Sequence, residues 1–166
     1  MQFKEILKSQ EDKIEEMSII ASSIVKEHFD PLIGAEQNDY MINKFQTVDS
    51  IKEQLENGYR YFLIIDNDVC VGFIAFYPKG KAMYLSKFYL HKDKRGKGYA
   101  HQMLEFVIRE AKYLDCQSIE LNVNKKNSAC LAYEKLGFQI IRSEKNDIVN
   151  GVKYTRENGQ IVKSVA

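Results

Sequence analysis

A basic, glycine-containing turn joins an extended segment directly to an amphipathic helix, and it constrains the fold more than any other feature. Residues 90–100 read LHKDKRGKGYA. The first amides of a helix have no partner within it, and the helix dipole places partial positive charge there. Glycines add backbone freedom and cations add charge, here Gly96, Gly98, Lys94, Arg95 and Lys97. The segment indicates a phosphate-binding turn or, alternatively, a solvated basic turn that only caps a helix.

The pattern before this turn predicts helices and then antiparallel strands. Apolar residues recur every three or four positions from Ile14 to His28, and we expect Asp30-Pro31 to end that helix. A second helical region, capped by Thr47 or Ser50, ends at Asn57-Gly58. Three extended segments, joined by short turns, then predict hairpins: Tyr59–Ile65, Val69–Tyr77 and Ala82–Leu90.

After the turn, the pattern predicts a parallel crossover and a further helix. The helix from Ala100 to Leu114 precedes a strand over Gln117–Val123, which gives a strand-helix-strand unit. A helix over Asn127–Leu136, ended by Gly137, precedes a strand over Phe138–Ile141. Residues 143–166 carry turn signals at Asn150-Gly151 and Asn158-Gly159, which predict a hairpin or a loose extension.

Composition favours one soluble domain over residues 1–166. The 166 residues carry 24 Lys and Arg against 23 Asp and Glu, so a net charge of +1 gives no general attraction to nucleic acid or membranes. Val69–Tyr77, one of the longest apolar stretches, is far shorter than the ~20 residues of a membrane span, and the amino terminus lacks a signal core. We therefore expect a cytoplasmic protein. Cys70, Cys116 and Cys130 lie in or beside apolar segments and are interpreted as buried thiols.

Two motifs together carry a resemblance to a known family. The turn matches neither GxxxxGK[ST] nor GxGxxG, which argues against a P-loop or Rossmann site. Arg95-Gly-Lys-Gly-Tyr-Ala100 resembles the R/Q-x-x-G-x-G/A signature of the GNAT (GCN5-related N-acetyltransferase) superfamily. Asn127-Ser-Ala-Cys-Leu-Ala-Tyr-Glu-Lys-Leu-Gly-Phe138 resembles its second signature. The resemblance covers residues 3 to 142, is strongest over 59–142, and leaves the tail aside.

The resemblance implies a fold and a coenzyme site. The expected fold is a single α/β domain with a central mixed sheet of six to seven strands, about four flanking helices, and strands splayed at the acetyl-CoA site. In similar proteins the turn's amides hold the pyrophosphate, and the strand before it bonds the pantetheine arm. The implied coenzyme-binding residues are Phe88, Tyr89, Leu90, Arg95, Gly96, Lys97, Gly98, Tyr99, Ala100, Asn127 and Tyr133. For the asparagine, Asn124 is a nearby alternative to Asn127.

The resemblance also implies direct acetyl transfer from acetyl-CoA to a primary amine of a small molecule, such as a polyamine, amino-sugar or antibiotic, or of a peptide. Tyr133 resembles the tyrosine that faces the cofactor sulfur; a phenol with a pKa near ~10 is protonated at neutral pH and can act as general acid. The alternative is a packing tyrosine. Many relatives carry a glutamate on the strand before the turn, but Met83–Phe88 holds no carboxylate. Two alternatives for the base stay open. One is a water held by Tyr84, Ser86 or Asn122, and the other is a carboxylate such as Glu120 or Asp39.

Several weaker signals remain in the sequence. We expect no metal, because His28, His91 and His101 are too scattered for ligand spacing. The run from Gln37 to Gln46 indicates an amine-acceptor pocket or plain helix packing. The missing strand carboxylate keeps open a non-catalytic module that senses acyl-CoA or binds a partner. Binding of nucleic acid through the basic turn would need a broader basic surface, and a homodimer is possible.

Overall fold

The computed structural model describes residues 1–124, 129–149 and 152–164. The chain packs as two compact units that alternate along the sequence. The first unit comprises residues 1–77 and 87–100, and the second comprises residues 78–86 and 101–166. Strand β4 (Ala82–Leu90) and helix α4 (Tyr99–Tyr113) each begin in one unit and end in the other.

Three helices form one side of the first unit: α1 (Glu11–Ile33), α2 (Ala35–Phe45) and α3 (Val48–Glu56). The prediction that α1 ends at Asp30-Pro31 is wrong, because the helix continues past the proline to Ile33, with Gly34 as its cap. Pro31 lies in the last turn, where its missing N–H removes a single helical hydrogen bond. Thr47 is the cap of α3, as predicted, and its hydroxyl accepts from the Ser50 amide at 3.1 Å.

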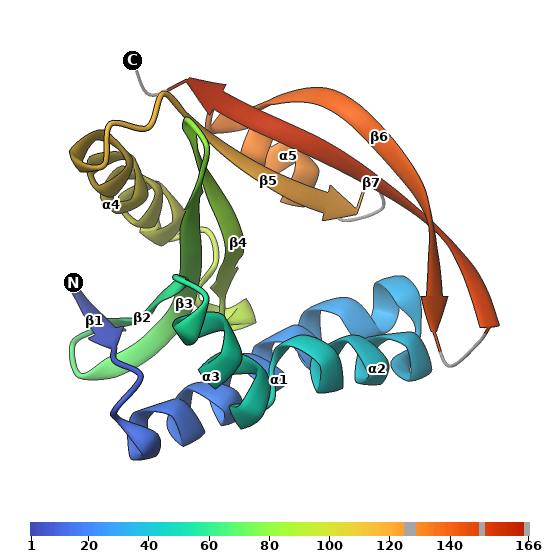
Figure 1. Cartoon of the computed structure of the whole chain (residues 1–166), viewed down its shortest axis with the longest axis horizontal. Helices are drawn as coiled ribbons and strands as arrows, with labels where there is room; N and C mark the ends of the chain where they lie inside the picture. Colours follow the sequence, from blue (N-terminus) through green and yellow to red (C-terminus); the bar gives the residue numbers. More distant parts are fainter. Residues whose placement is uncertain (125–128, 150–151, 165–166) are drawn as a thin grey trace. The chain divides into compact units, whose positions relative to one another are not determined.

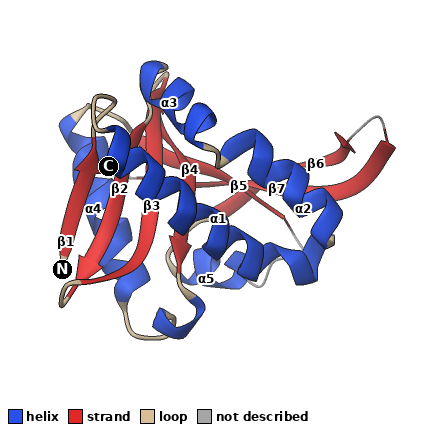
Figure 2. Cartoon of the chain, turned by 90° about the horizontal axis from the view of Figure 1, so that it is seen from below, coloured by secondary structure: helices blue, strands red, loops and turns tan. Residues whose placement is uncertain are grey.

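The sheet of the first unit contains a strand that the sequence did not reveal. β1 (Gln2–Ile6) pairs antiparallel with β2 (Arg60–Asp66), and β2 pairs antiparallel with β3 (Val69–Lys79), as Figure 2 shows. The three strands β2, β3 and β4 agree with the predicted extended segments. The amide of His91, just beyond β4, donates to the Val71 carbonyl at 2.9 Å, which ties the end of β4 to β3.

A hydrophobic core lies between α1, α3 and one face of β1, β2 and β3. The apolar positions of α1 that recur at helical spacing are buried in it, as the sequence predicted. The strands contribute alternate residues, because side chains at a spacing of two share a sheet face. The buried members of this core are Ile6, Ile14, Met17, Ala21, Ile24, Val25, Ile51, Tyr61, Leu63, Phe73 and Ala75.

The second unit holds the parallel crossover and the carboxyl-terminal tail. It contains β5 (Ser118–Asn124), α5 (Ala129–Lys135), β6 (Gln139–Val149) and β7 (Val152–Ser164). β4 and β5 pair in parallel, which confirms the predicted crossover. β6 and β7 form an antiparallel hairpin, and β7 also pairs with β5. Residues 143–149 and 152–164 therefore complete the sheet, and β6 extends well beyond the predicted Ile141; the turn signal Asn150-Gly151 lies outside the described residues.

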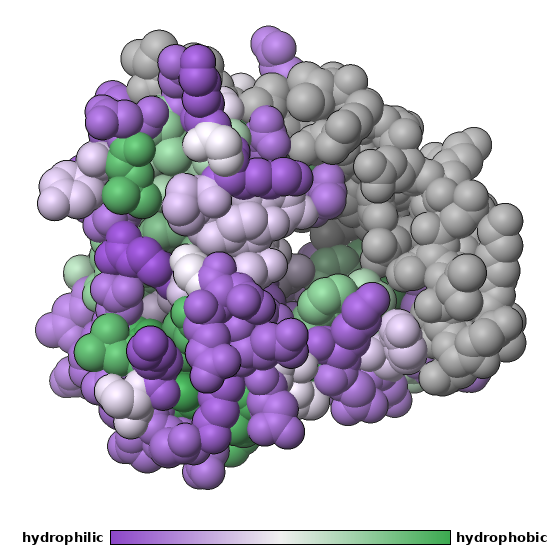
Figure 3. Space-filling model, viewed as in Figure 1, coloured by the Kyte–Doolittle hydropathy of each residue, from purple (hydrophilic) through white to green (hydrophobic). Residues whose placement is uncertain are grey.

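The described strands follow the order β1-β2-β3-β4-β5-β7-β6, a mixed sheet of seven strands (Figure 1). This confirms the predicted mixed α/β fold and its strand number; the described helices are five, one more than expected, with a short 3-10 turn, η1 (Lys92–Lys94). The face shown in Figure 3 is mostly hydrophilic where its residues are described. Within the described residues, no helix is long and apolar enough to span a membrane.

Candidate coenzyme and acceptor site

The turn predicted to bind phosphate connects β4 to α4 through η1. Gly96 and Gly98 have φ angles of 75° and 82°, a left-handed conformation that side chains other than glycine rarely adopt. A Cβ built at either glycine would meet no atom within 4 Å. Arg95 and Lys97 are exposed beside them. The turn is thus an open, basic loop that leads into the first amides of α4, an arrangement suited to an anion.

Side-chain contacts within the first unit hold both sides of this turn. Tyr99 Oη donates to Asp66 Oδ2 at 2.6 Å, which fixes the first residue of α4 to the end of β2. Arg95 Nη2 lies 3.0 Å from His28 Nδ1 on α1. The guanidinium can only donate, so this contact requires Nδ1 to act as the acceptor.

The residues implied to bond pantetheine lie at the carboxyl end of β4. Phe88, Tyr89 and Leu90 are half-buried, and they lie beyond the ladder with β5, which covers Ala82–Tyr84. On the β3 side the backbones approach closely: a Cβ added at Gly72 would lie 2.1 Å from the Tyr89 carbonyl oxygen.

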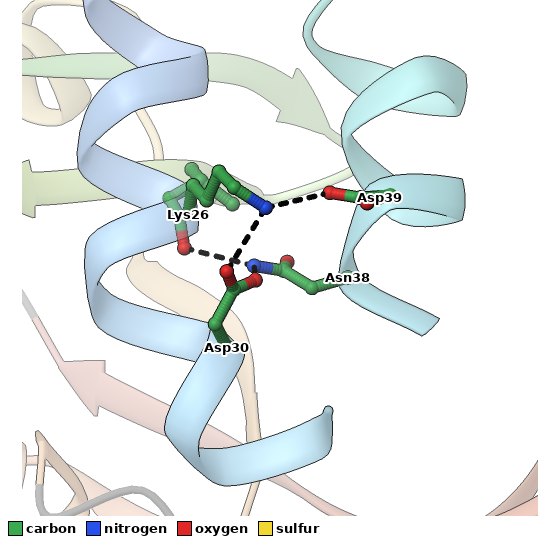
Figure 4. Close-up of polar contacts among 5 residues, drawn as sticks. Lys26, Asp30, Asn38 and Asp39 are labelled. Atoms are coloured by element: carbon green, nitrogen blue, oxygen red, sulfur yellow. Dashed lines mark hydrogen bonds and ion pairs between the residues drawn. The ribbon is translucent and has the colours of Figure 1, made fainter. Parts of the chain in front are cut away.

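The run from Gln37 to Gln46 was predicted to form either an amine-acceptor pocket or a plain packing helix. It lies in α2 and includes its cap, Gln46. Asn38 is buried, and its Nδ2 donates to Val25 O at 3.2 Å and to Asp30 Oδ1 at 2.7 Å (Figure 4). Lys26 Nζ lies 3.0 Å from both Asp30 Oδ2 and Asp39 Oδ1. The bonds from Asn38 and then from Lys26 lower the pKa of Asp30 below its usual value. Asp39, considered above as a base, is thus an exposed ion-pair partner.

A buried lysine that sequence reasoning did not single out lies next to Phe88. Lys87 is 4% exposed, and its Nζ donates to Phe45 O at 2.7 Å, to Gln46 Oε1 at 2.9 Å and to Tyr61 Oη. Burial lowers the pKa of Lys87 to about 7. The signal was present in the alternation of β4, where Met83, Leu85 and Lys87 share the inward face.

Two of the residues predicted to bind the coenzyme, Asn127 and Tyr133, belong to the second unit, and the structure describes only Tyr133. Tyr133 lies half-buried on α5, with its ring edge-to-face against Phe138 at 5.6 Å between centroids. Asn127 falls outside the described residues. Asn122 Nδ2 donates to Tyr84 Oη at 2.9 Å, so two of the side chains considered for holding a water are in contact.

The cysteine thiols show no sign of activation where they are described. Burial raises the pKa of Cys70 and of Cys116 above the usual value, which disfavours the reactive thiolate. Both are free, and Cys116 is buried, as expected, whereas Cys70 is half-buried. The Cys130 side chain lies outside the described part. Among the described residues, no cluster of three or more His, Cys, Asp or Glu could hold a metal ion.

Comparison with known proteins decides the family. The profile described as "Acetyltransferase (GNAT) domain" matches residues 29–156, which include the basic turn, β4 and α5. The chain belongs to the GNAT acetyltransferase family. No curated protein matches the sequence.

Solved structures of GNAT proteins share this fold at low sequence identity. The PaiA N-acetyltransferase of Thermoplasma acidophilum, solved with coenzyme A, has a TM-score of 0.75 at 14% identity and covers 99% of both chains. A GCN5-related N-acetyltransferase structure from Rhodopseudomonas palustris has a TM-score of 0.77 at 15% identity, over 98% of this chain and 94% of that one. A Bacillus subtilis acetyltransferase solved with CoA has a TM-score of 0.57 at 20% identity, over 70% and 82%.

Proposed function

We propose that this GNAT protein transfers the acetyl group of acetyl-CoA to a primary amine of a small molecule or peptide in a ternary complex. The observation that carries the proposal is the turn of residues 95–98, with two left-handed glycines, open space above them and exposed cations at the start of α4. GNAT neighbours of the same fold were solved with coenzyme A, which supports the choice of cofactor.

The residues present fit a pyrophosphate and a pantetheine arm. Gly96 and Gly98 leave room for an anion to approach the backbone, and a Cβ at Gly98 would both crowd that approach and strain the φ of 82°. Phe88, Tyr89 and Leu90 form the end of β4 just before the basic turn, and their backbone groups are the proposed partners of the pantetheine amides.

Tyr133 is the proposed general acid. As the amine nitrogen attacks the thioester carbonyl, the new C–N bond forms and the C–S bond breaks, so negative charge develops on the departing sulfur. A phenol stays protonated at neutral pH and can donate its proton to that thiolate. The amine gives up a proton to water, and no acetyl-enzyme is needed.

The first test is the thermal shift of the purified protein with acetyl-CoA, for the parent and for Gly98→Glu. At a concentration of 100 Kd, a ligand that binds only the folded state adds about 2.7 kcal/mol, a shift of several degrees. Gly58→Glu is the matched control, because Gly58 also has a left-handed φ, of 92°, and open space around it, but follows α3. We expect the shift in the parent and in Gly58→Glu and its loss in Gly98→Glu.

A second measurement separates catalysis from binding alone. Thiol release from acetyl-CoA is followed with a polyamine, an amino-sugar and a peptide with a free α-amino group. Release above the amine-free rate supports the transferase. A clear thermal shift with no release from any amine class would instead favour the acyl-CoA-sensing module, and no shift in the parent would contradict the coenzyme site itself.

A further inference from the structure

The junction between α2 and α3 is held by side chains from three surrounding elements. The carbonyls of the last two residues of α2 and of its cap accept side-chain hydrogen bonds, although such terminal carbonyls have no partner within a helix. Ser50 Oγ donates to Lys44 O at 2.8 Å, and Ser18 Oγ donates to Gln46 O at 2.7 Å. Phe45 O accepts from Gln54 Nε2 at 3.2 Å as well as from Lys87.

Lys87 is the member of this network that comes from β4. Its three hydrogen-bond partners in the described part of the chain are neutral oxygens, and two of them belong to the junction, Phe45 and Gln46. The partner from β2, Tyr61, donates in turn to Gln54 Oε1 on α3. The ammonium group also lies at the carboxyl end of α2, where the helix dipole favours a positive charge.

An amine at this position is costly for the fold, which argues that it does more than fill space. Burial disfavours the charged form, and this is why the pKa of Lys87 falls to about 7. A buried lysine bonded only to neutral groups lacks the Coulomb attraction of an ion pair. A methionine would fill a similar volume without that penalty, but it could not bond the junction.

We propose that the run from Gln37 to Gln46 belongs to the amine-acceptor pocket, and that Lys87 is a positioning residue that fixes α2 relative to the strand assigned to the coenzyme. This rests on the proposed function. Lys87 directly precedes Phe88, the first of the three residues assigned to pantetheine, and its side chain bonds the end of the run from Gln37 to Gln46. Binding of coenzyme A along Phe88–Leu90 orders this strand, and the Lys87 side chain transmits that order to the junction.

Hydrogen exchange with coenzyme A as the probe tests this without knowledge of the acceptor. In the parent we expect coenzyme A to slow amide exchange over residues 88–90 and also over residues 44–50. In Lys87→Met we expect coenzyme A still to slow exchange over residues 88–90 but no longer over residues 44–50. Lys4→Met, at an exposed lysine on β1, is the matched control and keeps both. Protection at the junction that persists in Lys87→Met would overturn the inference.

A second variant removes a hydrogen bond of Lys87 by changing the acceptor instead of the donor. Gln46→Met removes one acceptor of Lys87 and leaves the lysine in place, so it should lose part of the transmitted protection even if Lys87→Met folds poorly. With any amine that proves active, both variants should raise the KM for the amine several-fold and leave the KM for acetyl-CoA unchanged. Equal changes in both KM values would indicate a purely structural role and overturn the inference.

The outcomes separate the two proposals. No protection anywhere in the parent means that coenzyme A does not bind, and the proposed function fails together with the inference. Protection at residues 88–90 but not at 44–50 of the parent leaves the coenzyme site intact and overturns the role of Lys87 alone.

Discussion

Tyr99 Oη donates a hydrogen bond of 2.6 Å to Asp66 Oδ2, which joins the first residue of α4 to the last residue of β2. This bond raises the pKa of Tyr99 above its usual value, so the phenol stays protonated as a donor across the neutral range. The helix that begins at Tyr99 is the one whose first amides are assigned to the pyrophosphate. The position of its first residue is therefore set by a side chain of the binding motif itself.

Replacing Tyr99 with phenylalanine should weaken coenzyme binding and leave the ring's packing in place. The lost hydrogen bond leaves the start of α4 less firmly placed, and we expect the Kd for acetyl-CoA to rise about threefold to tenfold, as typical net hydrogen-bond energies imply. Calorimetric titration measures this. Tyr113→Phe is the control, because that tyrosine ends α4 and is 84% exposed. An unchanged Kd in Tyr99→Phe would contradict the anchoring role.

Gly72→Ala should destabilise the first unit because the two backbones at this point leave no room for a methyl group. The new Cβ would lie 2.1 Å from Tyr89 O and 3.1 Å from Leu90 Cα, so β3 and β4 would have to separate. We expect the free energy of unfolding in urea to fall by about 1–3 kcal/mol. Val69→Ala, at an exposed position of the same strand, should change it much less. A fully stable Gly72→Ala protein would show that the strands can move apart at little cost.

Lys87 should make stability depend on pH above neutrality. Its pKa is about 7 in the folded protein against the ordinary lysine value of 10.5, so between these values the unfolded chain binds a proton that the folded chain lacks. Raising the pH therefore favours folding. From pH 7 to pH 9 the free energy of unfolding of the parent should rise relative to Lys87→Met by about 2–3 kcal/mol. Urea unfolding at both pH values measures this difference, and parallel pH profiles for the two proteins would contradict the lowered pKa.

The local features of the fold were predictable, whereas features set by distant pairing were not. Aromatic and β-branched runs separated by short turns identified β2, β3 and β4. β1 was missed, because QFKEI carries little alternation and becomes a strand by pairing with β2, more than fifty residues away. The Asn158-Gly159 turn signal was overridden in the same way: Gly159 pairs with Val123 on β5 and with Ser143 on β6, and both ladders require extended backbone.

The candidate site was only partly predictable for a related reason. The basic turn was identified because its glycines and cations are contiguous in sequence, and the structure gives both glycines the left-handed φ they permit. Lys87 was missed because its partners come from two distant segments, Phe45-Gln46 and Tyr61, and a lysine is normally placed on the outer face of a strand.

Tyr133→Phe should lower turnover without weakening coenzyme binding. The variant keeps the ring and its edge-to-face contact with Phe138, and it removes the hydroxyl that is proposed to protonate the leaving thiolate. A positioned general acid contributes about a hundredfold or more, so kcat should fall by at least that factor. The Kd for coenzyme A should match that of the parent and of Tyr113→Phe.

The pH dependence distinguishes the acid role from a packing role. If Tyr133 supplies the proton, the parent's kcat should fall at high pH as the phenol ionises, and this limb should vanish in Tyr133→Phe. A packing tyrosine would lower stability on substitution and leave the shape of the pH profile unchanged. Equal turnover of the two proteins at every pH would contradict the acid role, because a thiolate that leaves without a proton has no need of the phenol.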